Sequence, residues 1–113
     1  MTNLYEAASI FDLEVVKILI ESGAKPNAKN IGGSTPLHGV LSGRQNWIQE
    51  TYEGTPEEYQ LSINIIKHLL ESGAAVNAKN DNGDTPLYYA ENLAEKNSQS
   101  EIVDLLVESG ARR

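Results

Sequence analysis

The side chains of this chain that could support catalysis or metal binding are few. A histidine is the first candidate for a general base or a metal ligand, and the chain has two, His38 and His68. No cysteine occurs, so disulfides, thiolate metal sites and a cysteine nucleophile are excluded by residue count. No serine has a histidine and an acid in an arrangement that can be read from the sequence.

Two segments rich in Asp, Asn and Gly resemble a calcium-binding loop and a phosphate-binding loop, but neither matches the full motif. Asp81, Asn82 and Asp84 suggest a calcium loop, but the segment is too short and lacks the distal glutamate of an EF-hand. Gly32 and Gly33 do not precede the Lys-Ser/Thr pair of a phosphate-binding loop. We therefore expect no enzymatic activity, no metal site and no cofactor.

The net charge of the chain indicates which classes of partner it can bind. Sixteen acidic and nine basic side chains give a net charge of −7. Such a field repels nucleic-acid phosphates and anionic membranes, so we expect neither as a partner, and a basic protein surface is favoured. The N-terminal stretch MTNLYEAASIFDLE fits neither a signal peptide nor a membrane span, and we expect a cytoplasmic protein.

The elements that position these side chains are repeated along the chain. The tetrapeptide Glu-Ser-Gly-Ala occurs three times, at residues 21–24, 71–74 and 108–111. An apolar run precedes each copy, at residues 14–20, 64–70 and 101–107. Runs this apolar suit helices that are packed on two sides, and the glycine after each run supplies the left-handed residue that ends it.

The first two copies continue into a turn and a second helix. Residues 27–30 and 77–80 both read Asn-Ala-Lys-Asn, and the Asn and Gly positions that follow suit a tight turn with positive φ. A Thr-Pro pair comes next in both copies, at residues 35–36 and 85–86. Threonine suits the N-cap and proline the first helical position, so a new helix is predicted at each pair.

This unit, with Thr-Pro-Leu-His at residues 35–38, resembles the ankyrin repeat, a family with a period of about 33 residues. Residues 2–8 look like a degraded copy of the same start. The resemblance implies an all-α solenoid of three helix pairs with projecting β-turns. It implies one domain over residues 1–113, with repeats at about 1–33, 34–83 and 84–113. It also implies that His38 ties neighbouring turns together, and that Asn27 and Asn77 stand where the family is hydroxylated in animal cells.

Against the family period of about 33 residues, the second repeat carries roughly 17 extra residues, at positions 43–60. Thr55, Pro56 and Glu58 predict that its second helix starts early and extends to Glu71. Residues 43–54 are then expected to be irregular. In the third repeat the first helix is expected to run on through residues 87–95, and Ser98 with Glu101 to cap the next.

Loops that interrupt a periodic scaffold often carry function, and Trp, Tyr and Arg are enriched at interface hot spots. Trp47 and Tyr52 are therefore candidate contacts. The alternative is that Trp47 and Ile48 fold back and close a small local core. The resemblance adds the family's variable turn and helix positions, so the predicted partner-binding residues are Ile31, Ser34, Trp47, Tyr52, Asp81, Asn82, Asp84 and Asn92.

Together these features predict a non-enzymatic protein–protein interaction module that binds through its concave face, turn tips and the 43–54 insertion. Two alternatives remain open: an acidic inhibitor or immunity-type protein that blocks a basic enzyme, and a structural excerpt of a longer array. The last helix keeps the pattern of an internal one. It is expected to continue into a longer array, to be covered by a partner or a second copy in a weak dimer, or to end a compact monomer whose outward Asp104, Glu108 and Arg112 suffice.

Overall fold

The computed structural model describes the backbone of residues 3–49, 56–97 and 101–112. Within these ranges the chain forms helices and no strand. The helices are α1 (Leu4–Ser9), α2 (Leu13–Glu21), α3 (Pro36–Gln49), α4 (Pro56–Glu71), α5 (Pro86–Asn97) and α6 (Glu101–Glu108). They form consecutive antiparallel pairs, which confirms the predicted all-α solenoid.

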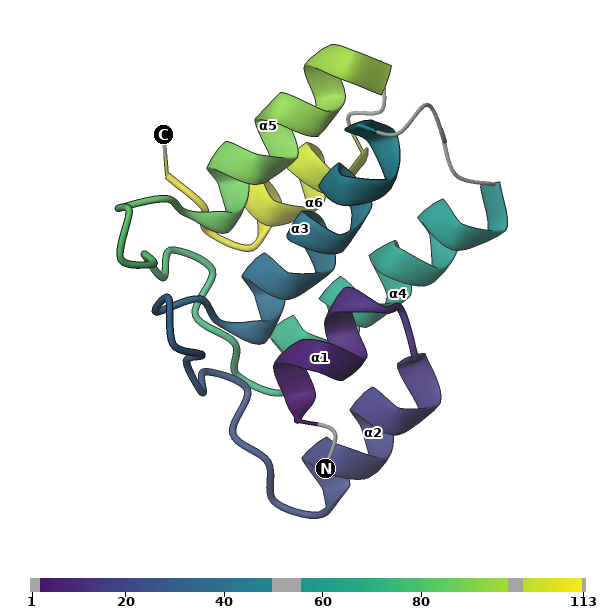
Figure 1. Ribbon diagram of the computed structural model, residues 1–113, viewed down its shortest axis with the longest axis vertical. Coiled ribbons are helices and arrows are strands. Elements are labelled where there is room, and N and C mark those ends of the chain that lie inside the picture. The colour runs from purple at the N-terminus through teal and green to yellow at the C-terminus, as the bar shows by residue number, and fades with distance from the viewer. Residues whose placement is uncertain (1–2, 50–55, 98–100, 113) are drawn as a thin grey trace.

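The pairs stack so that their first helices form one layer and their second helices another (Figure 1). Helix α3 packs between α1 and α5, and α4 packs against α2. The connections from α2 to α3 and from α4 to α5 project together from one side of the stack (Figure 1). This arrangement places the two turns side by side at the ends of the first-helix layer.

Side-chain caps begin the first two helices. The Asn3 carboxamide oxygen accepts the Glu6 N–H at 2.8 Å, and an Asp12 carboxylate oxygen accepts the Val15 N–H at 3.2 Å. Asn3 therefore caps α1, at the position where proline stands in the other two copies. In the other two copies the cap is a threonine one residue earlier in the alignment, before the proline.

The two Thr-Pro pairs differ in what the threonine hydroxyl does. The Thr85 hydroxyl accepts the Tyr88 N–H at 3.2 Å, as predicted for an N-cap. The Thr35 hydroxyl lies 2.9 Å from Nδ1 of His38. The difference follows from the residue after Thr-Pro-Leu: His38 contacts the Thr35 hydroxyl with its ring, and Tyr88 at the matching place makes no such contact with Thr85.

The predicted ends of the helices hold with one exception. Helix α4 begins at Pro56 and ends at Glu71, and α5 extends to Asn97. Gly23, Gly73 and Gly110 adopt φ values of 102°, 99° and 105° just after the second helices, as the Glu-Ser-Gly-Ala pattern predicts.

The exception is the segment that follows Ser42. Residues 43–49, including Trp47, continue α3 and are not part of an irregular loop. The stretch contains no proline, and its Arg and Gln residues favour a helix, so α3 continues although Gly43 is a weak helix former. Tyr52, with the predicted caps Thr55 and Ser98, lies outside the described residues.

The core fills the space between the two layers. In α4, Tyr59, Ile63 and Ile66 are buried and Leu70 is half-buried, which confirms that they share one face. The other fully buried aliphatic side chains come from every layer of the stack. The largest of them are Val16, Leu37, Val40, Leu41, Ile65, Leu69, Leu87 and Leu106.

Gly39 sets how closely α1 and α3 approach. A Cβ atom at this position would lie 3.1 Å from both the carbonyl oxygen and the ring of Tyr5. A backbone carbonyl in a packed helix has little room to move, so a side chain at this position would force α1 and α3 apart by a few tenths of an ångström. The sequence pattern did not single out this residue.

We predict that Gly39→Val lowers the free energy of unfolding by roughly 2 kcal/mol or more, because the added methyl groups overpack the α1–α3 contact. Denaturant titration followed by circular dichroism measures the change. Asn64→Val, at an exposed site on α4, carries the same β-branched cost and should stay within about 0.5 kcal/mol of wild type. Equal stability of the two variants would contradict the close contact.

Candidate functional site

The projecting turns are built around an asparagine side chain. In the first turn the Asn30 carboxamide oxygen accepts the N–H groups of Gly32, at 3.0 Å, and Ser34, at 2.9 Å. Asn80 makes the same pair of bonds in the second turn, both at 3.0 Å. Each turn is therefore closed by its own side chain and keeps its shape without a ligand.

The turns have the expected positive φ, which falls on their glycines and not on their asparagines. Among the described residues other than glycine, only Phe11 has a positive φ, at 61°. Gly33 and Gly83 take the left-handed conformation, with φ values of 76° and 80°. The asparagines are needed instead for their carboxamide oxygens.

A backbone hydrogen bond joins the two turns. The Asp81 N–H donates to the Gly32 carbonyl oxygen at 3.0 Å. Beside this bond the Asp81 side chain lies over Gly33 so closely that a Cβ atom there would overlap it. The tips are thus held against each other as one surface.

His38 forms a second connection beneath the tips. Its ring is fully buried, and Nδ1 accepts the Thr35 N–H at 3.0 Å. Because Nδ1 is an acceptor, the proton of the neutral ring lies on Nε2, which donates to the Asp84 carbonyl oxygen at 2.9 Å. This contact to the next turn confirms the linking role that the ankyrin resemblance implied.

Tyr89 completes this buried cluster, and the sequence analysis missed it. Its ring meets the His38 ring edge to face, with centroids 5.7 Å apart. The Tyr89 hydroxyl accepts a hydrogen bond from the Asn80 amide at 2.8 Å. Burial raises the pKa of the Tyr89 hydroxyl. No repeated pattern marked this residue, because Gly39 and Glu6 occupy the matching places in the other helix pairs.

Burial lowers the pKa of His38 below its ordinary value of 6.5, against opposing contributions from the carbonyl and carboxylate of Asp84. The charge of Lys29 lowers it further. The unfolded chain therefore binds a proton near pH 6.5 that the folded chain does not. The stability supplied by the neutral ring is complete above that pH and is lost as the pH falls below it.

We predict that the free energy of unfolding of the wild type decreases as the pH is lowered from 7 through the region just below 6.5, and that this step is missing in His38→Gln. The variant should also lose about 1–3 kcal/mol at neutral pH, since buried hydrogen-bond partners are left unsatisfied. Urea titrations across this pH range measure both effects. A step of equal size in the variant would show that another group is responsible.

Asparagine also links the second-helix layer. The Asn27 carboxamide accepts the Ala75 N–H at 2.6 Å and donates to the Gly73 carbonyl oxygen at 3.1 Å. Asn77 makes the same bridge, accepting the Arg112 N–H at 2.9 Å and donating to the carbonyl oxygen of residue 110 at 3.0 Å. These amides join each helix pair to the next, and hydroxylation of either asparagine stays a prediction.

We predict that Asn27→Ala destabilises the fold by about 1–2 kcal/mol, because the Ala75 N–H and the Gly73 carbonyl lose their partners in an exposed setting. Asn64→Ala is the matched control, since its bond to Gln60 lies within one helix, and it should cost less than about 0.5 kcal/mol. Thermal unfolding of the two variants provides the comparison. A smaller loss for Asn27→Ala than for the control would exclude the bridging role.

The structure brings several predicted partner contacts together at the tips. Ile31 is fully exposed, with a relative accessibility of 102%, and Asp81 and Asn82 are exposed on the adjoining turn. Asp84 and Asn92 are half-buried. Trp47 lies on the last turn of α3, outside the tips.

Ser34 was predicted to contact a partner, and the structure does not support that prediction. Only 9% of the residue is exposed, and its hydroxyl accepts a bond from the Asn80 amide at 3.4 Å. The joining of the two turns covers it, which a single-turn pattern does not reveal. Ser34 thus has a structural role and is removed from the candidate contacts.

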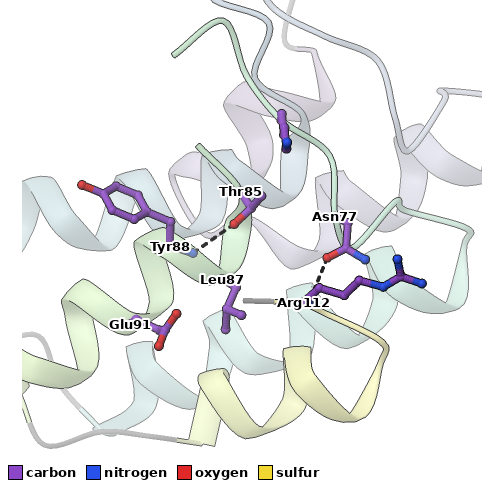
Figure 2. Close-up of a pocket in the computed structure, with 7 residues that line it drawn as sticks. Asn77, Thr85, Leu87, Tyr88, Glu91 and Arg112 are labelled. Atoms are coloured by element: carbon purple, nitrogen blue, oxygen red, sulfur yellow. Dashed lines mark hydrogen bonds between the residues drawn. The ribbon is translucent and has the colours of Figure 1, made fainter. Parts of the chain in front are cut away.

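Two shallow hollows flank the tips. The first adjoins Ile31 and is lined by Asn3, Tyr5, Glu6, Lys29, Asn30 and Ile31. The second lies against α5, with Leu87 and Tyr88 toward one end and Asn77 and Arg112 toward the other (Figure 2). Tyr88, which stands where His38 stands in the preceding pair, is 52% exposed. Both hollows are open surfaces and suit contact with a macromolecule more than enclosure of a small ligand.

No set of three or more potential metal ligands occurs in the part of the chain that the structure describes. His68 is half-buried on α4, and its Nε2 has no hydrogen-bond partner among the described residues. Across the same ranges, no helix is long and apolar enough to cross a membrane.

Comparison with known proteins agrees with this geometry. The family profile described as "Ankyrin repeat" matches residues 1–31 and 82–112, which is more than half of the chain. The chain therefore belongs to the ankyrin-repeat family. A search of curated proteins finds no match.

Among solved structures, the chain is similar to the crystal structure of the human ASB11 ankyrin repeat domain, with 28% identity and a TM-score of 0.69. The match covers 99% of this chain and 41% of that one. Ankyrin repeats are generally protein–protein interaction modules, and their fold is generally a non-enzymatic scaffold.

Proposed function

We propose that this chain is a non-enzymatic module that binds another protein through its turn tips and concave face, with help from the 43–54 segment. The observation that carries the proposal is Ile31, a large aliphatic side chain that is fully exposed on a rigid turn. Exposing it is costly in water, and burying it against a partner would be favourable.

Charge and rigidity support the same surface. Asp81 and Asn82 are exposed on the turn next to Ile31, and Asp84 is half-buried there. A partner with basic side chains would complement these groups and the overall charge of −7. Because Asn30, Asn80 and the Asp81 N–H already fix the turns, little ordering is needed on binding.

The tip surface is small by itself. A standard interface buries about 800 Å² per partner, so contacts beyond Ile31 and the acidic turn are needed. The hollow beside Tyr5 and Glu6 extends the surface along α1. Trp47 and Tyr52 are proposed as further contacts, in keeping with the enrichment of aromatic residues at hot spots.

We predict that Ile31→Asp weakens partner binding by about tenfold or more, since it removes the buried anchor. The partner would first be isolated by affinity capture from a lysate, then purified and titrated by calorimetry. Ile18→Asp is the control, because Ile18 is also an exposed isoleucine, at 58%, but lies on α2 in the second-helix layer. Unchanged affinity in Ile31→Asp, or an equal loss in Ile18→Asp, would refute the tip site.

The inhibitor alternative predicts a different salt response. An acidic surface that blocks a basic enzyme should associate at a rate that falls steeply with ionic strength, whereas contact centred on Ile31 should depend on salt weakly. Measuring the association rate with Asp81→Asn beside wild type separates the two cases. A scaffold role in a longer array is a third proposal, and retention of tip binding by the isolated chain would argue against it.

A further inference from the structure

Helix α6 has an unoccupied groove on its surface. Val107 is 45% exposed on this helix. Val103, Asp104, Glu108 and Ala111 line a shallow groove around it. Val107 and the half-buried Ala111, which follows the end of α6, form a short apolar stripe over the buried Val103, with the two acidic residues beside it.

The same side of α2 carries a helix. Alignment on the Glu-Ser-Gly-Ala segments places Val16 and Ile20 of α2 where Val103 and Val107 stand on α6. Helix α4 packs against α2, and Ile20 there is half-buried, whereas Val107 is exposed. The groove on α6 therefore corresponds by alignment to a side of α2, the helix two levels earlier in this layer, against which α4 packs.

The charges beside the stripe differ between the two helices. On α2 the flanking residues are Lys17 and Glu21, and on α6 the matching ones are Asp104 and Glu108. Helix α4, which covers α2, carries Lys67 and has its acidic residues, Glu57, Glu58 and Glu71, at its two ends. A helix that covers α6 meets two carboxylates, which favours basic side chains on that helix.

A second copy of this chain suits the groove poorly. Each copy carries a net charge of −7, which opposes self-association. The acidic rim thus favours a foreign, cationic helix.

We propose that the α6 groove binds an amphipathic basic helix of a partner protein. The apolar side of that helix packs on Val107 and Ala111, and its lysine or arginine side chains pair with Asp104 and Glu108. This is the helix-in-groove mode of recognition. The surface shares no residue with the turn-tip site, so it provides the chain with a second, independent interface.

The test uses two synthetic helical peptides with the full chain. Both carry leucines at helical spacing, and they differ only in having lysines or glutamates beside the leucines. Binding is followed by nuclear magnetic resonance of backbone amides, which locates the contact. We expect the lysine peptide to bind and to shift the signals of residues 103–111, and the glutamate peptide to bind at least about tenfold more weakly.

Variants then separate this site from nonspecific attraction to an acidic protein. Val107→Glu should weaken the lysine peptide by about tenfold, and Asp104→Lys with Glu108→Lys should reverse the preference between the peptides. Ile31→Asp with Asp81→Lys is the control and should leave the α6 shifts unchanged. The control also keeps a failure here distinct from a failure of the turn-tip site.

Three results would overturn the proposal. The first is no binding of the lysine peptide at millimolar concentration, or shifts centred on the turns. The second is an affinity that Val107→Glu does not change. The third is a wild-type dimer in sedimentation that Val107→Glu dissociates, because a second copy would then be the occupant.

Discussion

The neutral imidazole of His38 fixes how the two projecting turns are placed relative to each other. His38 accepts from the Thr35 N–H and donates to the Asp84 carbonyl oxygen, so a single buried ring satisfies backbone groups in two successive turns. Both bonds are lost if the ring is absent, and the bond from the Thr35 N–H is lost if Nδ1 is protonated, because a protonated Nδ1 cannot accept. The position of the second turn relative to the first follows from this constraint.

Four asparagine side chains likewise bind backbone groups, both within the turns and between successive helix pairs. Asn30 and Asn80 close the turns from within, while Asn27 and Asn77 join the ends of successive second helices. All four present an amide at a place where backbone groups lack partners. The stability of a repeat protein depends on contacts between neighbouring repeats. In this chain the polar side chains fix the position of each repeat relative to the next, and burial of aliphatic side chains drives folding.

Most of the fold could be predicted from the sequence, because its repeated signals are local. Glycine after an apolar run ends a helix and Thr-Pro begins one, so α4 from Pro56 and the extension of α5 followed directly. The continuation of α3 through Gln49 was missed, because the family pattern ends its helix near Gly43 and the residues beyond carry no strong start or stop signal. Gly39 was also missed, since its role depends on how near Tyr5 approaches from another helix.

The candidate site was predictable where exposure follows from the turn alone, as for Ile31 and Asp81. It was not predictable for Ser34, which is buried because two turns meet. Tyr89 was overlooked for the same reason, since its importance comes from packing on His38. Contacts between repeats are long-range, and a pattern read along one repeat does not contain them.

The two projecting turns form one preformed surface. Native-state amide hydrogen exchange of the Asp81 N–H, which donates to Gly32, tests it most directly. If the turns are joined as described, this amide exchanges with a free energy of opening close to that of the buried first-helix layer, for example the Gly39 N–H of α3. Exchange through a local opening far easier than that of α3 would show that the tips move independently and would contradict the account.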